Sequence, residues 1–251
     1  MEYEEPPDAV NDFGPIADIY DELVSWAPYR RWVDDLEERL RGHGLSCGAE
    51  LLDAACGTGL STLPWLRKGY SVTAVDRSAE ALRQARRKVR GRDYTVRFVR
   101  GDLLDLGLDG PFEAAVCMHS GLDYLLDEDD LRRALEGLRR PLQPGSLLSF
   151  DKCLHRPGFY RDEVTTRRSL DCGEAVLTHT WDRGRRLMKQ ECVISRRKDG
   201  EEVGRDRVVF YLKAVPLEDL VDMVEDAGFR VLEPPRPFRV HDPGMGIFRA
   251  V

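Results

Sequence analysis

Apolar positions along the chain change their spacing twice, and each change marks a different part of the predicted fold. From Phe13 to Leu40, apolar residues recur at helical spacing and are interrupted near Pro28, which predicts two helices. From Glu50 to Phe150, short apolar strands alternate with helices. Strands joined by such crossovers form parallel sheets, so we expect a Rossmann-like, doubly wound α/β core.

The predicted core elements follow one another closely. Strands are expected at 50–54, 70–75, 96–99, 112–118 and 146–150, and helices at 60–68, 79–89 and 128–138. After residue 151, β-branched runs at 163–170, 175–181, 187–196 and 203–212 are separated by turn sequences, which predicts antiparallel hairpins. The pattern ends with a helix at 216–226, stopped by Gly228, and strands at 229–232 and 247–251.

These changes divide the chain into four predicted parts. Residues 1–48 form lid helices, and residues 49–151 form the Rossmann-like core. Residues 152–206 form an antiparallel β insert over the substrate side. Residues 207–251 supply a helix and strands that complete the mostly parallel core sheet, with 207–213 expected to re-enter that sheet.

Charge and composition narrow the class of protein. The net charge of −7 lacks the basic footprint of a nucleic-acid binder, and the basic run from Arg83 to Arg92 is interpreted as a solvated helix face. The six cysteines show no CxxC pair and no zinc spacing, so we expect no metal. No apolar run approaches the roughly 20 residues of a membrane span, and the acidic N-terminus does not resemble a signal peptide. We therefore expect a cytoplasmic protein, and a homodimer is left open as its assembly.

The strongest chemical signal is the run from Asp53 to Gly59, which reads DAACGTG. An apolar strand that enters a turn of small residues and then a helix allows a ligand to approach the backbone closely. Ala55 stands where a dinucleotide motif would have its first glycine. This turn therefore suits a nucleoside better than a pyrophosphate, although an ordinary turn would look the same.

Two further acidic residues follow neighbouring strands. Asp76 comes 23 residues after Asp53, close to the spacing of about 20 at which a carboxylate meets a ribose hydroxyl pair. Asp102 follows the third strand, where it can reach an adenine edge. A structural role for Asp76 as a helix N-cap is less well supported, because Ser78 suits that position better. Together these carboxylates predict a nucleoside site.

The runs LLDAACGTG, AVDRS, FVRGDLLDL and FEAAVCMHSGLDYL resemble, in order and spacing, motifs I to IV of class I methyltransferases that use S-adenosylmethionine (SAM). The leading IYDELVSWAPYRRWVDDL and the late VPLEDLVDMVEDAGFRVL resemble the cap helix and the closing helix and strand of that family. The insert and the ending GMGIFRAV resemble its small-molecule branch, which includes glycine and amino-sugar N-methyltransferases. Ala55 departs from the commoner glycine, and Lys213 and Val215 replace residues frequent in relatives.

The resemblance implies SAM as cofactor, a small-molecule substrate and a set of contacts. The methionine end of SAM would lie against Asp53, Ala55, Gly57 and Gly59. Asp76 with Arg77 would hold the ribose, and Asp102 with Leu103 would bracket the adenine. His119 would lie beside the cofactor, and Tyr20 and Trp32 would come from the lid.

A SAM methyl group is already activated, so positioning a nucleophile about 3 Å away supplies most of the catalysis. A base is needed only for a protonated nucleophile. The candidate catalytic residues are His119, Asp151 and Tyr124. His119 and Asp151 follow strands at the edge where sites form. The position of His119 fits a structural residue that lines the cofactor equally well, and packing is favoured for Tyr124. Weaker candidates are Asp123, His155 and His179, the two histidines being expected at the surface.

Three functions remain open from the sequence. The first is methyl transfer from SAM to a nitrogen or oxygen of a small molecule by in-line displacement. The second is a SAM-using enzyme of the cyclase or lyase type on the same fold. The third is a regulatory subunit that binds SAM without catalysis, although the intact Asp76 and glycine turn argue against it. The insert must shape the acceptor site, and its sequence does not name the acceptor.

Overall fold

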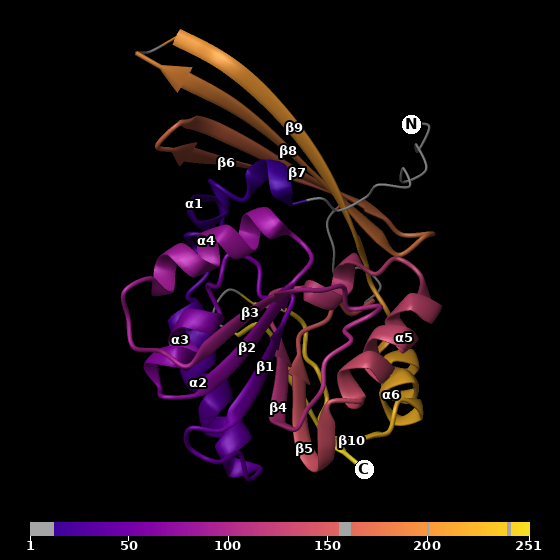
Figure 1. The fold of residues 1–251 in the computed structure, drawn as a ribbon. Helices are drawn as coiled ribbons and strands as arrows, with labels where there is room; N and C mark the ends of the chain where they lie inside the picture. Colours follow the sequence, from indigo (N-terminus) through magenta and orange to yellow (C-terminus); the bar gives the residue numbers. More distant parts are fainter. Residues whose placement is uncertain (1–12, 156–161, 200, 240–241) are drawn as a thin grey trace.

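The chain forms a seven-stranded sheet with helices on both faces and a separate four-stranded sheet beyond the ends of its strands (Figure 1). The computed structural model describes residues 13–155, 162–199, 201–239 and 242–251. In the large sheet the strand order is β10-β11-β5-β4-β1-β2-β3. Its strands are β1 (Glu50–Ala54), β2 (Ser71–Asp76), β3 (Val96–Arg100), β4 (Phe112–Cys117), β5 (Leu142–Phe150), β10 (Phe229–Glu233) and β11 (Gly246–Ala250).

Strand direction places the candidate residues at one edge of the large sheet. Strands β1 to β5 pair in parallel, and β11 runs antiparallel between β5 and β10. The predicted, mostly parallel sheet is therefore confirmed. Ala54 pairs with Val75, and Cys117 pairs with Phe150, so the residues that follow β1, β2, β4 and β5 all emerge at the same edge.

Two apolar layers hold helices against the large sheet. The helices α2 (Tyr29–Gly42), α3 (Thr62–Arg67) and α4 (Ala79–Val89) cover one face, and α5 (Glu128–Arg139) and α6 (Leu217–Asp226) cover the other. Along β1, Leu51 packs in the first layer with Trp32 and Trp65, and Leu52 packs in the second with Leu135. All five side chains are almost fully buried, and such burial stabilises by about 1.5–3 kcal/mol per large apolar side chain.

The N-terminal segment is less regular than its apolar spacing predicts. A 3₁₀ turn η1 (Gly14–Ile16) and a single helical turn α1 (Tyr20–Leu23) replace the first expected helix. The second begins at Tyr29, directly after Pro28, which confirms the predicted interruption. Ile16, Ile19 and Leu23 are buried against the four-stranded sheet, so tertiary packing rather than helix propensity holds this segment.

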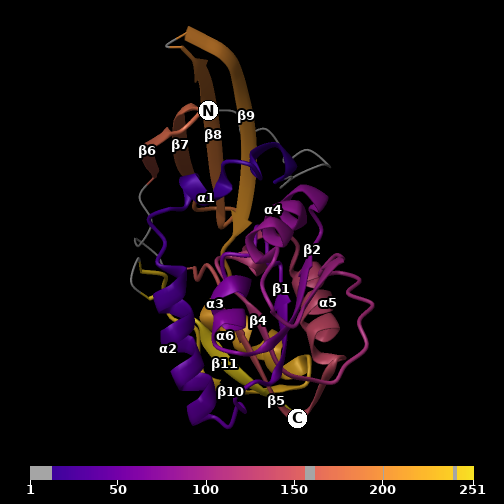
Figure 2. The same cartoon turned by 60° about the vertical axis from the view of Figure 1, so that its left-hand side comes forward.

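The four-stranded sheet is an antiparallel meander of β6 (Glu163–Leu170), β7 (Gly173–Asp182), β8 (Leu187–Lys198) and β9 (Glu201–Lys213). Two of its connecting residues, Arg186 and Asp199, have positive φ. One face carries Leu170, Ala175, Ile194 and Phe210 and packs on the N-terminal segment. Figure 2 shows α1 between this sheet and the body of the protein.

The expectation that residues 207–213 re-enter the main sheet is wrong. These residues pair with β8 along their whole length, from Arg207 with Val193 to Lys213 with Leu187. Val208, Phe210 and Leu212 are buried together against the N-terminal segment. An alternating pattern predicts that one face of the strand is buried, but it does not identify the sheet that the strand joins.

The stems that join the four-stranded sheet to the core lie side by side. The N–H of His155 donates to the carbonyl of Val215, and the N–H of Val215 donates to the carbonyl of Cys153. The chain then enters α6, which ends before Gly228 with its φ of +86°, as the sequence predicts. Among the described residues, no helix is long and apolar enough to cross a membrane.

Candidate active site

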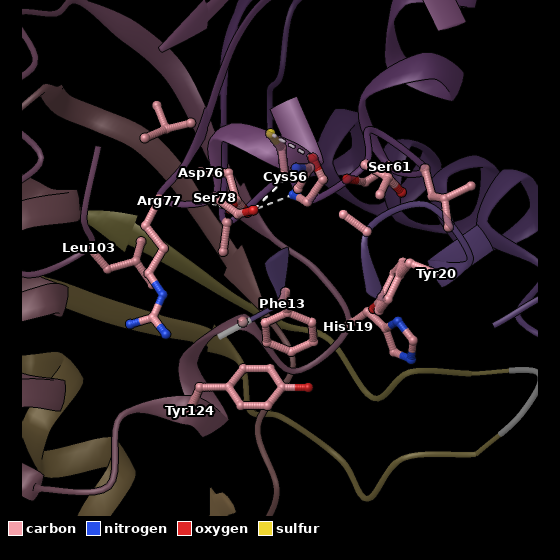
Figure 3. Close-up of a pocket in the computed structure, with 18 of the residues that line it drawn as sticks. Phe13, Tyr20, Cys56, Ser61, Asp76, Arg77, Ser78, Leu103, His119 and Tyr124 are labelled. Carbon is pink, nitrogen blue, oxygen red and sulfur yellow. Dashed lines mark hydrogen bonds between the residues drawn. The ribbon is translucent and has the colours of Figure 1, made fainter. Parts of the chain in front are cut away.

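A cavity of about 580 Å³ opens at the edge where β1, β2 and β4 end (Figure 3). Its walls come from the turn after β1, the start of α4, the loop after β3 and the turn after β4. The N-terminal segment and the first residue of α2 complete it. Its lining includes Phe13, Tyr20, Tyr29, Ala55, Asp76, Arg77, Asp102, Leu103, His119 and Tyr124, together with the backbone of Gly57.

The turn after β1 is built from left-handed backbone. Ala55, Gly57 and Gly59 have φ angles of +54°, +54° and +81°. A Cβ at Gly59 would lie 3.0 Å from the Cβ of Ala85 on α4, so this glycine permits close packing of the turn on the helix. Ala55 adopts a conformation that costs a non-glycine residue about 1 kcal/mol or more. Its side chain lines the cavity.

Asp76 organises the cavity wall between β2 and α4. One carboxylate oxygen, Oδ2, accepts the N–H of Gly57 at 2.8 Å, and Oδ1 accepts the N–H of Ser78 at 2.8 Å. Ser78 in turn caps α4 by accepting the N–H of Ala81, as predicted. Burial raises the pKa of Asp76. Each of its oxygens has a further lone pair, so the carboxylate is able to accept a pair of hydroxyl groups from the cavity.

The loop after β3 adds the rest of this end of the cavity. Asp102 is exposed and accepts the N–H of Leu104 at 3.0 Å through Oδ1. Leu103 lies half-buried beside it, and Arg77 is exposed after Asp76. The carbonyl of Arg77 accepts a hydrogen bond from the Nε–H of Arg100 at 3.1 Å. The structure therefore brings together Asp76, Arg77, Asp102 and Leu103, as the sequence predicts.

The turn after β4 holds two non-glycine residues in left-handed backbone, His119 with φ +63° and Ser120 with φ +68°. The N–H of Ser120 donates to Oδ2 of Asp151 at 2.8 Å. The next residue, Gly121, has no room for a side chain, because a Cβ there would lie 2.5 Å from Sγ of Cys117. Each left-handed residue costs on the order of 1 kcal/mol or more, and the buried Asp151 helps to hold the strained turn.

His119 projects from this turn into an aromatic group. Its ring lies 5.3 Å from Tyr29, 5.6 Å from Trp32, 5.8 Å from Trp26 and 6.3 Å from Phe238, between centroids. Its Nδ1 shares a hydrogen bond with the phenol oxygen of Tyr29. Burial lowers the pKa of His119 to about 4, so the imidazole is neutral at neutral pH.

A second aromatic group lines the same part of the cavity as His119 (Figure 3). Phe13 stacks on Phe210 with centroids 4.3 Å apart and meets the edge of Tyr124 at 5.0 Å. Tyr20 lies 6.0 Å from Phe13. Tyr124 therefore packs, as the sequence favours, and also lines the cavity. The stack joins the 3₁₀ turn η2 (Gly121–Tyr124) to the four-stranded sheet.

Four residues expected at the site lie behind its lining rather than in it: Trp32, Asp53, Gly59 and Asp151. Asp53 is fully buried and accepts hydrogen bonds from Ser61 at 2.9 Å and Thr62 at 2.6 Å, and burial raises its pKa to about 6. It ties β1 to the start of α3. Trp32 packs under His119, and Asp151 holds the turn that carries His119. These residues support the lining instead of forming it.

Two contacts at the site were not found from the sequence. Asp123, a weak candidate base, forms a fully buried ion pair with Lys152 at 2.8 Å, and Lys152 also donates to the carbonyl of Lys213. This pair fastens η2 to both stems of the four-stranded sheet.

His155, another weak candidate, does not line the cavity. Its ring stacks near Trp181, with centroids 6.5 Å apart.

The second contact is a latch between Asp21, Thr58 and Lys88. Asp21 accepts the hydroxyl of Thr58 at 2.6 Å through Oδ1 and pairs with Lys88 at 2.5 Å through Oδ2. Lys88 also donates to the carbonyl of Thr58 at 2.7 Å. The latch joins the lid turn α1 to the turn after β1 and to α4, directly beside the cavity-lining Tyr20. Lys88 belongs to the basic run that the sequence assigned wholly to solvent.

Comparison with known proteins gives the chain a family. A family model described as a methyltransferase domain matches residues 51–145. A dTDP-4-amino-2,3,4,6-tetradeoxy-D-glucose N,N-dimethyltransferase of Saccharopolyspora spinosa is 32% identical over 224 residues, which cover 85% of each chain. The putative methyltransferase YqeM of Bacillus subtilis is 36% identical over 136 residues, 54% of this chain and 53% of that one.

The chain spans about half the length of the first curated relatives that it matches. Among solved structures, an S-adenosylmethionine-dependent methyltransferase of Clostridium acetobutylicum aligns over 96% of this chain and 99% of its own, with a TM-score of 0.79 and 22% identity. That likeness supports the Rossmann-like fold. The relative that matches over 85% of both chains carries the assignment: the chain belongs to the class I SAM-dependent methyltransferases.

Proposed function

We propose that this protein transfers the methyl group of SAM to a nitrogen or oxygen of a small-molecule acceptor. The observation that carries the proposal is a single cavity with two chemically different ends. The Asp76 carboxylate stands at one end, and neutral His119 with an aromatic wall stands at the other. Family membership supports SAM as the molecule that spans them.

The residues at the first end fit the nucleoside part of SAM. Asp76 would accept the two ribose hydroxyls while its backbone partners Gly57 and Ser78 keep it in place. Leu103 offers an apolar surface to the adenine, and Asp102 offers an acceptor to its amino group. A cavity of about 580 Å³ lies in the range of small-molecule sites, roughly 300–1,000 Å³.

The residues at the second end suit a transfer between a cation and a nucleophile. Bound SAM supplies a methyl group activated by a positively charged sulfur. The rings of Phe13, Tyr20 and Tyr124 line this end, and aromatic faces attract cations and exclude water. Positioning by these walls, rather than acid or base chemistry, provides most of the rate enhancement.

His119 is the group that would contact the nucleophile. Its neutral imidazole accepts a hydrogen bond from the N–H or O–H of the acceptor and aims the lone pair of the nucleophile at the methyl group. For a hydroxyl acceptor, the oxygen–carbon bond forms as the carbon–sulfur bond breaks, and the hydroxyl proton moves to His119. Asp151 acts through the turn that carries His119, and Tyr124 acts through its ring.

The acceptor class is proposed from the cavity and the relatives. The N-terminal segment with Phe13 and Tyr20 lines the cavity, and the four-stranded sheet packs against that segment, which favours a small molecule over a folded macromolecule. The relative from Saccharopolyspora spinosa is named for an amino sugar carried on dTDP. An amino group on a sugar or amino acid is therefore the first acceptor to test.

The test incubates the protein with methyl-labelled SAM and a panel of amino acids, amino sugars and nucleotide-linked amino sugars. Products are separated by chromatography and identified by mass. We expect a labelled methylated acceptor with an equal amount of S-adenosylhomocysteine. Release of methylthioadenosine without methylated product would show lyase-type chemistry. Tight SAM binding without turnover across the panel would favour a regulatory subunit, and either result would overturn methyl transfer.

A further inference from the structure

The phenol of Tyr29 forms a hydrogen bond with the imidazole of His119, although the two residues lie 90 positions apart in the chain. Tyr29 is the first residue of α2 and is buried to 8% exposure. Pro28 precedes it and fixes where the helix begins. The rings of Trp26, Trp32 and Phe238 surround His119, so the imidazole cannot turn over without repacking them. Tyr29 is therefore placed to decide how His119 uses its two ring nitrogens.

The hydrogen bond involves Nδ1 of His119 and leaves Nε2 for the cavity. In the part of the chain that the structure describes, Nε2 has no hydrogen-bond partner and is not among the buried unpaired atoms. His119 lines the cavity. The nitrogen that meets a bound molecule is thus Nε2, and the position of the single imidazole proton decides whether it accepts or donates.

Tyr29 also interacts with the phenol of Tyr20. Burial raises the pKa of Tyr20 to about 12 and that of Tyr29 well above its ordinary value, so both phenols are protonated at neutral pH. Tyr29 has one hydroxyl proton, and when Tyr20 receives it, the oxygen of Tyr29 is free to accept the Nδ1–H of His119. Figure 3 shows Tyr20 and His119 on the same side of the cavity.

We propose that Tyr29 is a positioning residue that accepts the Nδ1–H of His119 and thereby leaves the Nε2 lone pair facing the methyl acceptor. The chain of hydrogen bonds then runs from His119 to Tyr29 to Tyr20. This inference rests on the proposed methyl transfer and deepens it, because it states how His119 receives the nucleophile.

The reverse arrangement fits the proposed chemistry poorly. If Tyr20 donated to Tyr29 and Tyr29 to Nδ1, Nε2 would carry a proton and point an N–H dipole into the cavity. That proton would repel the sulfonium charge and would compete with the N–H or O–H of the acceptor. A lone pair at Nε2 attracts both groups, and the partner of the other ring nitrogen is what sets a histidine tautomer.

The tautomer is measured directly by ¹⁵N NMR of the full chain labelled at histidine, with S-adenosylhomocysteine added. The five histidines are distinguished by comparison with a His119→Gln variant. We expect Nε2 of His119 to give the signal of an unprotonated nitrogen and Nδ1 that of a protonated one. The opposite assignment in the wild type would overturn the proposal, whether or not an acceptor for methyl transfer has been found.

A Tyr29→Phe variant tests the role in turnover. The ring remains and only the phenol oxygen is lost, so we expect His119 to show both tautomers and kcat to fall roughly 10–100-fold. The KM for the acceptor and the affinity for SAM are expected to change by less than about threefold. Tyr70→Phe is the matched control. The Tyr70 hydroxyl donates a hydrogen bond to Glu37 at 3.0 Å, and Tyr70 does not line the cavity. Unchanged tautomers in Tyr29→Phe would contradict the positioning role.

Discussion

Asp151 at the end of β5 accepts the N–H of Ser120 in the turn after β4, at 2.8 Å. The bond joins the ends of two neighbouring parallel strands and holds two consecutive left-handed residues, His119 and Ser120. The other oxygen of Asp151, Oδ1, is buried and has no partner among the described residues. A buried carboxyl group is thus retained at an electrostatic cost, and the backbone geometry that presents His119 is what it supports.

That cost predicts a pH dependence of stability. Burial and the nearby Asp123 raise the pKa of Asp151 to about 7, whereas an unfolded aspartate has a pKa near 3.9. Between these values the unfolded chain binds fewer protons, so stability falls as pH rises through the folded pKa. Asp151→Asn keeps an acceptor for Ser120 and has no charge to desolvate. We therefore expect the difference in free energy of unfolding, variant minus wild type, to increase by roughly 2–4 kcal/mol from pH 4 to pH 8.

Urea titrations of both proteins at several pH values measure this difference. Asp53, whose pKa burial raises to about 6, titrates in both proteins and cancels in the comparison. If the difference in unfolding free energy between the two proteins stayed constant from pH 4 to pH 8, Asp151 would already be ionised in the folded protein at pH 4. That result would contradict the raised pKa.

Asp76→Ala is expected to weaken SAM binding by about 1–3 kcal/mol, because a charged acceptor for the ribose hydroxyls is removed. The same change leaves the N–H groups of Gly57 and Ser78 without their present acceptor. Isothermal titration with SAM measures the loss, and circular dichroism monitors folding. Equal affinity in wild type and variant would remove the assignment of this carboxylate to the ribose.

The latch on the lid turn predicts slower release of SAM in the wild type than in a latch variant. Lys88→Met removes the cation that holds Asp21 and Thr58 together. We expect the dissociation rate of SAM to rise roughly tenfold, about 1.4 kcal/mol. Stopped-flow tryptophan fluorescence follows dissociation. Arg83→Met is the control, because among the described residues Arg83 on the same helix pairs with Glu80 and does not contact the latch. Equal rates in both variants would speak against a latch.

Gly121→Ala is expected to destabilise the protein by more than about 2 kcal/mol, since the new methyl group overpacks the turn after β4. Its nearest neighbour would be Sγ of Cys117, and Cys117→Ala removes that atom. The double variant is therefore expected to recover part of the loss. Thermal unfolding of the single and double variants gives the coupling energy. Additive effects would show that the clash lies with the Cβ of Ala55 instead, 3.0 Å from the same position.

Local patterns in the sequence predicted the features whose causes are local. The strand, glycine turn and helix around Gly57, the acidic end of β2 at Asp76 and the cap at Ser78 depend on neighbouring residues, and the structure confirms their geometry. The end of α6 at Gly228 belongs with them. Each of these features follows from backbone conformation or capping within a few residues.

Contacts between distant residues were beyond the sequence patterns. Lys88 has the spacing of a solvated helix residue, and nothing nearby indicates that Asp21 will pair with it. The same holds for His119 and Tyr29, and for Asp123 and Lys152. The alternating run at 207–213 fits either sheet. In each case the partner is chosen by the assembled fold, which period and propensity do not encode.

The paired stems around Lys152 have a consequence for how such proteins diversify. The four-stranded sheet leaves and re-enters the core at adjacent points, closed by the bonds between Cys153, His155 and Val215. A replacement sheet would need to match these two ends, to leave a carbonyl for Lys152 and to present an apolar face to the N-terminal segment. The four-stranded sheet can therefore be exchanged as a cassette during evolution or in a designed chimera, while the large sheet and the residues that line the cavity are left intact.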